Sequence, residues 1–244
     1  MSSIGKNFIK STRYSLMTPS DQAAGLPQPP LQTAPVSAKK FITLPEAEID
    51  KEKAACFKNL SESRRSIRKY ANKPISLNEL SYLLWCSQGV KKLVDNRATF
   101  RTVPSAGARH AIETYILVNN VDGLEKGIYW YNALEHKISL VINTKNIADK
   151  ITEACFSQKF VKKSAVTFIW IADIHRMAWR YGDRGYRYLF LDAGHICQNV
   201  YLAAESIDCG VCAIAAYDDD KMNSLLELDD EKQFVIYLAT AGKK

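Results

Sequence analysis

The spacing of apolar residues changes several times along the chain, and each change predicts an element. The capping box Ser76-Leu-Asn-Glu79 opens a stretch, 77–89, that carries leucines on one side and so predicts an amphipathic helix. A second helix is predicted over 186–207, which has no proline, one glycine and apolar residues at helical spacing. Because this stretch is largely apolar, we expect a long and central helix.

Runs rich in β-branched and aromatic residues predict strands. They cover 113–119, 127–132, 136–142, 165–172, 210–216 and 233–241, and the second and third can form a hairpin. Shorter helices are expected near 145–157 and 219–227. The acidic run Asp218–Asp220 suits the N-terminus of the latter better than a metal site. Strands and helices mix without strict alternation, so the predicted class is α+β, with a mostly antiparallel central sheet flanked by helices.

The first 45 residues differ from the rest, because they contain six of the eight prolines. Proline removes a backbone donor and fixes φ, so this segment is neither mostly helix nor central strand. Its apolar residues, such as Phe8, Leu26 and Phe41, favour an extended arm docked on the body over a floppy tail. We therefore divide the chain into a proline-rich arm, 1–45, and one folded domain, 46–244.

Composition narrows the function classes. The chain has 244 residues, 47% of them hydrophobic, and a net charge of +7, values that suit a globular domain with a sizeable core. No zinc-finger or RNA-binding signature accompanies the positive charge, which disfavours nucleic acid and favours small anionic ligands. No apolar run approaches the ~20 residues that span a bilayer, and the N-terminus lacks a signal-peptide core. We expect a soluble, cytoplasmic protein without membrane contact.

Cysteine and histidine give little sign of metal or thiol chemistry. Cys209 and Cys212 form a lone CxxC in an apolar run, where residues three apart on a strand point to opposite faces. We favour two buried structural thiols over a redox pair or half a metal site. The four histidines lack ligand spacing, so no metal is expected. His110 and His195 are candidate proton donors, although His195 is better interpreted as a core residue of its helix.

The strongest local signal is the run Arg64-Arg65-Ser66-Ile67-Arg68-Lys69-Tyr70. In an extended segment Arg64, Ser66 and Arg68 alternate and so point to the same side. A phosphate on that side could accept several charge-assisted hydrogen bonds. A solvated basic turn before a helix explains the spacing equally well.

A second signal lies between Arg101 and Ala108, in the run Pro104-Ser-Ala-Gly107. Small residues after a proline let the backbone approach a flat ligand closely, while Ser105 and free N–H groups supply polar contacts. By itself, this run is better explained as an ordinary loop between a helix and a strand.

Together and in this order, the two segments resemble the nitroreductase superfamily. RRSIRKY is similar to its phosphate-binding entry motif, and PSAG to its flavin-contacting loop. Three further segments are similar to family segments: 180–195, which leads into the long helix, 210–217, which passes one face of the flavin, and 237–243, the closing strand. The resemblance covers roughly 60–244, and the branch it points to is the SagB type (thiazole/oxazole oxidase-like), whose free-standing members have a similar proline-rich arm.

The resemblance implies a nitroreductase-like FMN-binding fold, an intertwined homodimer and no catalytic side chain, because flavin N5 carries the chemistry. It gives the FMN phosphate to Arg64, Ser66 and Arg68, with a late contact from Lys243, and places Arg65 near the ribityl or pyrimidine side. The other implied contacts are a lining, from the partner subunit, of Pro104, Ser105, Ala106 and Gly107, and backbone N–H groups of Ile214, Ala215 and Ala216 towards N5 and O4. Many members carry an acidic residue and a glycine where this chain has Ala215 and Ala216, so only backbone roles carry over there.

The implied activity is hydride transfer from NADH or NADPH, through the flavin, to a small organic acceptor of nitroaromatic or quinone type, with ping-pong kinetics. Two alternatives stay open. One is a SagB-type azoline dehydrogenase acting on a modified peptide, and the other is a non-catalytic flavin-binding protein. The sequence does not choose between the two nicotinamide donors.

Overall fold

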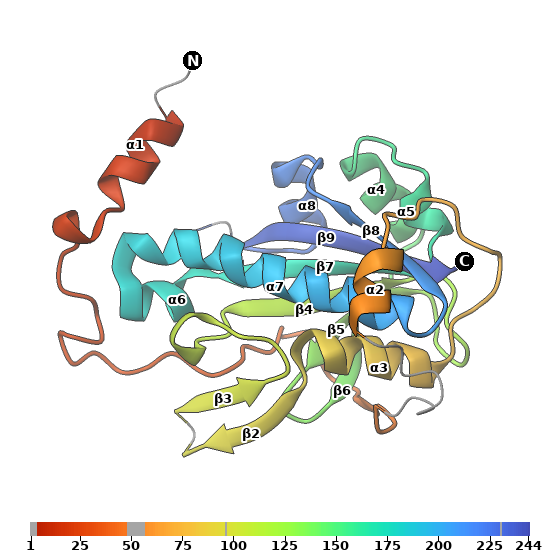
Figure 1. Cartoon of the computed structure of the whole chain (residues 1–244), viewed down its shortest axis with the longest axis horizontal. Helices are drawn as coiled ribbons and strands as arrows, with labels where there is room; N and C mark the ends of the chain where they lie inside the picture. The colour runs from red at the N-terminus through yellow and green to blue at the C-terminus, as the bar shows by residue number, and fades with distance from the viewer. Residues whose placement is uncertain (1–3, 48–56, 96, 230) are drawn as a thin grey trace.

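The computed structural model describes residues 4–47, 57–95, 97–229 and 231–244. Its centre is a seven-stranded sheet in the order β1-β6-β5-β4-β7-β9-β8, in which every pairing is antiparallel (Figure 1). This arrangement confirms the predicted α+β class. The strands are β1 (Ile42–Thr43), β4 (Ile112–Val118), β5 (Gly127–Asn132), β6 (Lys137–Ile142), β7 (Val166–Asp173), β8 (Cys209–Ile214) and β9 (Gln233–Lys243).

Side chains of the central strands alternate between two apolar cores, one on each face of the sheet. On β7, Phe168 and Trp170 belong to the first core, and Ile169 and Ile171 to the second. Helices cover both faces, as Figure 1 shows. The first core is closed by α3 (Leu77–Gln88), α6 (Ile174–Tyr181) and α7 (Gly185–Glu205), and the second by α4 (Ile147–Ala154), α5 (Phe160–Lys163) and α8 (Asp219–Leu225).

The long helix α7 is the central element of the first face. It has 21 residues and packs against α3, α6 and β8, which fits the prediction of a long helix over 186–207. Its outer side is less polar than usual, because Phe190 and Leu191 are each 58% exposed. None of the described helices combines the length and the apolar character needed to cross a membrane.

Local sequence signals account for most element positions. The Ser76 side chain accepts from the Glu79 N–H, and the Glu79 carboxylate accepts from the Ser76 N–H, so the predicted capping box opens α3. The predicted hairpin is β5–β6, and Asp218 caps α8 as expected. The sequence did not predict β1, α1 (Ile4–Ser11), α2 (Phe57–Ser63), α5, α6 or the hairpin of β2 (Val90–Val94) and β3 (Ala98–Arg101).

The N-terminal segment lies along the body after α1, which projects away from it (Figure 1). The Gln22 N–H donates to the Trp179 carbonyl at 2.8 Å, and the Trp179 indole donates to the Leu26 carbonyl at 3.0 Å. Further along, Leu44 is buried in the first core. The division of the chain at residues 45 and 46 stays a prediction, and residues 48–56, just after it, lie outside the described part.

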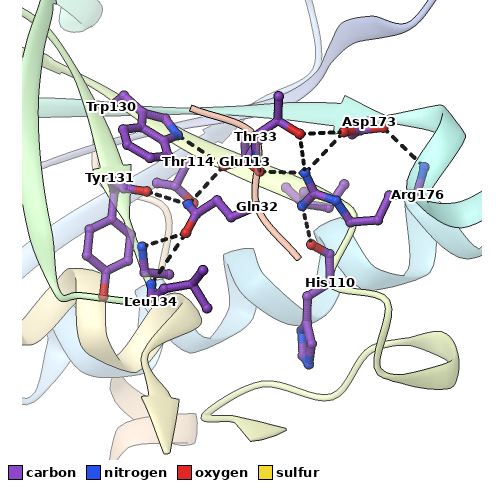
Figure 2. A network of polar contacts seen from close by, with 12 residues as sticks. Gln32, Thr33, His110, Glu113, Thr114, Trp130, Tyr131, Leu134, Asp173 and Arg176 are labelled. Carbon is purple, nitrogen blue, oxygen red and sulfur yellow. Dashed lines mark hydrogen bonds and ion pairs between the residues drawn. The ribbon is translucent and has the colours of Figure 1, made fainter. Parts of the chain in front are cut away.

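A buried ion cluster anchors the same segment (Figure 2). Arg176 of α6 pairs with Glu113 of β4 at 2.8 Å and with Asp173 at 3.0 Å. Gln32 and Thr33 from the N-terminal segment both donate to the Glu113 carboxylate, the first from its side-chain amide at 2.9 Å and the second from its N–H at 3.2 Å. The segment therefore contributes polar groups to the interior of the folded body.

Candidate functional site

The basic segment 64–70 follows α2 and runs beside the edge strand β8. The Ile67 N–H donates to the Val211 carbonyl at 2.8 Å, and Ser66 forms a parallel bridge with Val211. A Cβ added at Gly210 would lie 2.6 Å from the Ile67 Cβ, so only glycine lets the segment approach the strand this closely. The segment is thus held in extended form, as its interpretation as a phosphate motif requires.

Tyr201 of α7 contacts both this segment and β8. Its hydroxyl lies 3.0 Å from Ser66 Oγ and accepts from the Ala213 N–H at 2.9 Å, while the Arg64 guanidinium lies over its ring at 5.4 Å. Arg64 and Ser66 therefore share one side of the segment, as alternation predicts. If Tyr201 donates its proton to Ser66 Oγ, the Ser66 proton is available to an acceptor outside the protein.

The basic segment concentrates positive charge. In the described ranges, none of Arg64, Arg65 and Arg68 forms an ion pair with a carboxylate. Arg65 and Arg68 are exposed. Burial raises the pKa of the Cys212 thiol, and the charge of Arg68 opposes that rise, which places Arg68 close to β8 as well. Cations that lack a partner among the described carboxylates, grouped in one short segment, are suited to an anion.

Three other residues that are expected to contact FMN, Ala215, Ala216 and Lys243, lie near the ends of strands β8 and β9. Ala215 and Ala216 are exposed and follow Ile214, the last residue of β8. Lys243, at the end of β9, forms an ion pair with Glu79 of α3. Burial alone would raise the pKa of Glu79, yet the bonds from Lys243 and Ser76 leave it below its ordinary value. A phosphate contact by Lys243 stays a prediction, and it would compete with Glu79.

The loop that contains Pro104 to Gly107 is fixed by α7 as well. Ser105 Oγ donates to the Asp192 carboxylate at 2.6 Å, and the Ala106 N–H donates to the same carboxylate at 3.2 Å. The hydroxyl proton of Ser105 is therefore directed to Asp192 rather than outward. Asp192 and Tyr201 are nine residues apart, so the loop and the basic segment meet α7 at points roughly 14 Å apart along its axis.

Thiol and metal chemistry receive no support from the described residues. Cys209 and Cys212 are both free and buried, and burial raises the pKa of the Cys209 thiol to about 11, so a reactive thiolate is disfavoured there. Within the described part of the chain, no three His, Cys, Asp or Glu residues are grouped so that they could hold a metal ion. His195 is exposed, contrary to its interpretation as a core residue, because it lies on the outer side of α7.

Sequence reasoning missed the two polar residues that position these segments, Asp192 and Tyr201. Both are buried, at 4% and 9% exposure, within the apolar stretch of α7. A carboxylate in the buried face of an apolar helix needs hydrogen-bond donors, and this requirement could have marked Asp192 as a positioning residue. The sequence does not indicate which residues supply those donors, because Ser105 is 87 residues away from Asp192.

The described site can be compared with known proteins. The model of the nitroreductase family matches residues 62–243, which is most of the chain. The chain belongs to the nitroreductase family. It is 35% identical over 181 residues, 74% of its length, to MJ1384 of Methanocaldococcus jannaschii, a protein named for the same family, and it covers 87% of that protein.

Two further relatives extend the comparison. The trifolitoxin-processing protein TfxB of Rhizobium leguminosarum is 31% identical over 133 residues, which are 53% of this chain and 36% of TfxB. A crystal structure of an Anabaena variabilis protein named as a nitroreductase matches with a TM-score of 0.70 at 29% identity, over 84% of this chain and 41% of that one. The chain therefore spans well under half of both proteins. These likenesses confirm the fold, and the relatives include members of the SagB-type branch.

The residues present fit FMN. Its phosphate needs several donors on one side. Arg64 and Ser66 meet at Tyr201 beside β8, where Gly210 brings the segment close to the strand, and alternation predicts the same side for Arg68. The exposed turn at Ala215 and Ala216 lies beyond the end of the same strand, and its small side chains leave its backbone open to a flat ring.

Proposed function

We propose that this nitroreductase family member is an FMN-dependent oxidoreductase that transfers hydride from NADH or NADPH to a small organic acceptor. One observation carries the proposal. The basic segment is held in extended form beside β8, and its three guanidiniums form no ion pair with the described carboxylates. An unpaired cationic strip of this kind is suited to a phosphate dianion.

When bound, FMN would supply the two-electron centre, at N5, for hydride transfer to an acceptor of nitroaromatic or quinone type. The chain's own residues bind and orient the cofactor. Arg64, Ser66 and Arg68 hold its phosphate, with Arg65 near the ribityl or pyrimidine side. The backbone N–H groups at Ile214, Ala215 and Ala216 would lie towards N5 and O4, where they would stabilise negative charge.

We further propose that the chain works as a homodimer in which Pro104 to Gly107 line the flavin of the partner. The exposed Phe190 and Leu191 on α7 support an interface there, since two large apolar side chains next to each other on a helix surface are suited to contact with a second chain. An obligate interface buries on the order of 2,000 Å² or more. Light scattering that finds a stable, FMN-loaded monomer at micromolar concentration would contradict this arrangement.

The test is purification followed by a visible spectrum. We expect a yellow protein with about one non-covalent FMN per chain, and stopped-flow mixing with NADH or NADPH should bleach the flavin bands. A colourless protein that fails to bind added FMN would falsify the proposal. The rates with the two donors decide which nicotinamide is used.

An azoline dehydrogenase acting on a modified peptide is the second candidate, and the likeness to the trifolitoxin-processing protein TfxB favours it. The two candidates differ in the working state of the flavin. Oxidised flavin that is reduced by a peptide azoline, but only slowly by either nicotinamide, would favour the dehydrogenase. A non-catalytic flavin-binding protein is the third candidate, and it would bind FMN tightly while every donor reduced it slowly.

A further inference from the structure

Asp192 is a buried carboxylate whose partners belong to a single loop. It lies on the inner side of α7, is 4% exposed, and forms no ion pair with any described lysine or arginine. Burial raises the pKa of its carboxyl, and the bonds from Ser105 and Ala106 only partly oppose this. A buried carboxylate is costly even with His195 close enough to oppose the rise of its pKa, so the contacts it makes need an explanation.

Those contacts close the loop 104–110 at both ends. The Ser105 hydroxyl donates to Asp192 at 2.6 Å and also accepts from the His110 N–H at 2.8 Å, while the Ala106 N–H donates to the second carboxylate oxygen at 3.2 Å. One carboxylate therefore fixes two consecutive residues, and through Ser105 it also fixes the far end of the loop.

The loop is strained and tightly packed. Ala108 has φ +53° and His110 has φ +45°, conformations that residues with a Cβ rarely adopt without support. Gly107 also has a positive φ, and a Cβ there would lie 2.5 Å from the Tyr181 hydroxyl. The loop is thus pressed between α6 and α7, and the Asp192 bonds offset the strain that would otherwise open it.

We propose that Asp192 is a positioning residue for FMN. Its carboxylate holds residues 104–107 in the conformation that lines the flavin. This inference rests on the proposed function, because it assumes that the loop contacts the cofactor. A carboxylate is suited to this task because each of its two oxygens accepts one of the donors, whereas an amide at the same place has a donating NH2 instead of one of those oxygens. In this arrangement Ser105 acts through its backbone, since its proton is committed to Asp192.

Asp192→Asn and Ser105→Ala, alone and combined, test the inference, with Asp122→Asn as the charge-matched control on an exposed turn. FMN affinity is measured by fluorescence titration, and hydrogen exchange of the 104–110 peptide is measured without FMN. We expect Asp192→Asn to weaken FMN binding about tenfold and to speed exchange in that peptide, because a loop that is no longer fixed must be ordered on binding. The double variant should bind FMN about as tightly as the single variant that has the lower FMN affinity, because both changes remove the same contact.

Two readouts separate positioning from a general loss of stability. Ser105→Thr keeps the hydroxyl and should restore both affinity and protection. The visible bands of bound FMN should shift in Asp192→Asn and stay unchanged in Asp122→Asn, since only the first alters the surroundings of the ring. If Asp192→Asn does not fold, Ser105→Ala and Ser105→Thr provide the same comparison.

The outcomes distinguish this inference from the proposed function. If the wild-type protein fails to bind FMN, the proposed function and this inference both fall. If the wild-type protein binds FMN, while Asp192→Asn binds it equally well with an unchanged spectrum, the inference is overturned and the proposed function stands. Loss of affinity equal to that of Asp122→Asn also overturns it, because charge alone would then explain the effect.

Discussion

Replacing Arg176 with methionine tests how much stability rests on the buried ion cluster of Figure 2. The guanidinium donates to Glu113 at 2.8 Å, to Asp173 at 3.0 Å and to the His110 carbonyl at 3.0 Å. The side chains of Arg176 and Glu113 are each 2% exposed, so water cannot replace the lost partner. Methionine is long enough to fill part of the same space without a charge.

We expect Arg176→Met to lower the free energy of unfolding by about 3 kcal/mol, the lower end of the usual cost of breaking a buried pair. The lower end applies because Glu113 keeps three other donors, from Gln32, Thr33 and Trp130. Adding Glu113→Gln removes the charge that is left unpaired. The double variant should therefore lose less stability than the sum of the single variants.

The control is Lys162→Met, which breaks a pair of similar length in water. Lys162 and Asp149 are 2.7 Å apart, but their side chains are 44% and 58% exposed, so this variant should lose at most about 1 kcal/mol. Urea unfolding followed by tryptophan fluorescence gives the free energy of unfolding for each variant. If Arg176→Met costs no more than Lys162→Met, burial does not set the strength of the Arg176 pair and the reasoning is wrong.

Arg68→Ala should weaken FMN binding about ten- to a hundredfold, because a phosphate loses a charge-assisted partner, whereas Lys91→Ala on the exposed side of β2 should change little. Equal effects in fluorescence titrations would mean that the basic segment is only a surface turn. His110 should make the protein less stable in acid, since burial, followed by the charge of Arg101, lowers its pKa from 6.5 to about 3. Between these pH values the unfolded chain binds a proton that the folded chain does not, so the free energy of unfolding should fall by up to about 1.4 kcal/mol for each pH unit of acidification. When urea titrations are repeated across this pH range, the free energy of unfolding of His110→Asn should depend less steeply on pH. Cys209→Ser combined with Cys212→Ala should leave flavin reduction within a few-fold of wild type, and a variant that binds FMN but no longer passes electrons to its acceptor would make the thiols catalytic.

The elements that could be predicted carry local signals. The capping box at Ser76 and Glu79 starts α3 where expected, and a short, almost continuously apolar run predicts β7 as a buried strand. The missed helix α6 does have a cap, Asp173, but that residue is also the last of the preceding strand, and the cap was not recognised. The β2–β3 hairpin was missed for a different reason, since its run of lysines and exposed residues lacks the alternation of a half-buried sheet.

The candidate site was predictable to the extent that its residues are consecutive. Arg64, Ser66 and Arg68 could be grouped because alternation along one extended segment determines their side, and the contacts of Arg64 and Ser66 with Tyr201 agree with that grouping. Lys243 could not be judged in this way. Its pairing with Glu79 joins residues 164 apart, and nothing in the local sequence indicates which residue the ammonium meets.

The inward polar residues of α7 suggest how such distant contacts could be anticipated. Asp192 fixes the loop at Ser105, Asn199 donates to the carbonyls of Cys86 at 3.0 Å and Thr102 at 3.3 Å, and Tyr201 accepts from the Ala213 N–H. Each partner group belongs to a loop or to an element end, or, for Ala213, to the edge strand that the basic segment borders. A polar side chain on the buried side of an apolar helix costs free energy unless it is bonded, and irregular backbone supplies the groups that helices and strands have already used. Polar residues within an apolar helix therefore mark where the chain's irregular segments are attached, and in this chain two of those segments are the ones expected to bind FMN.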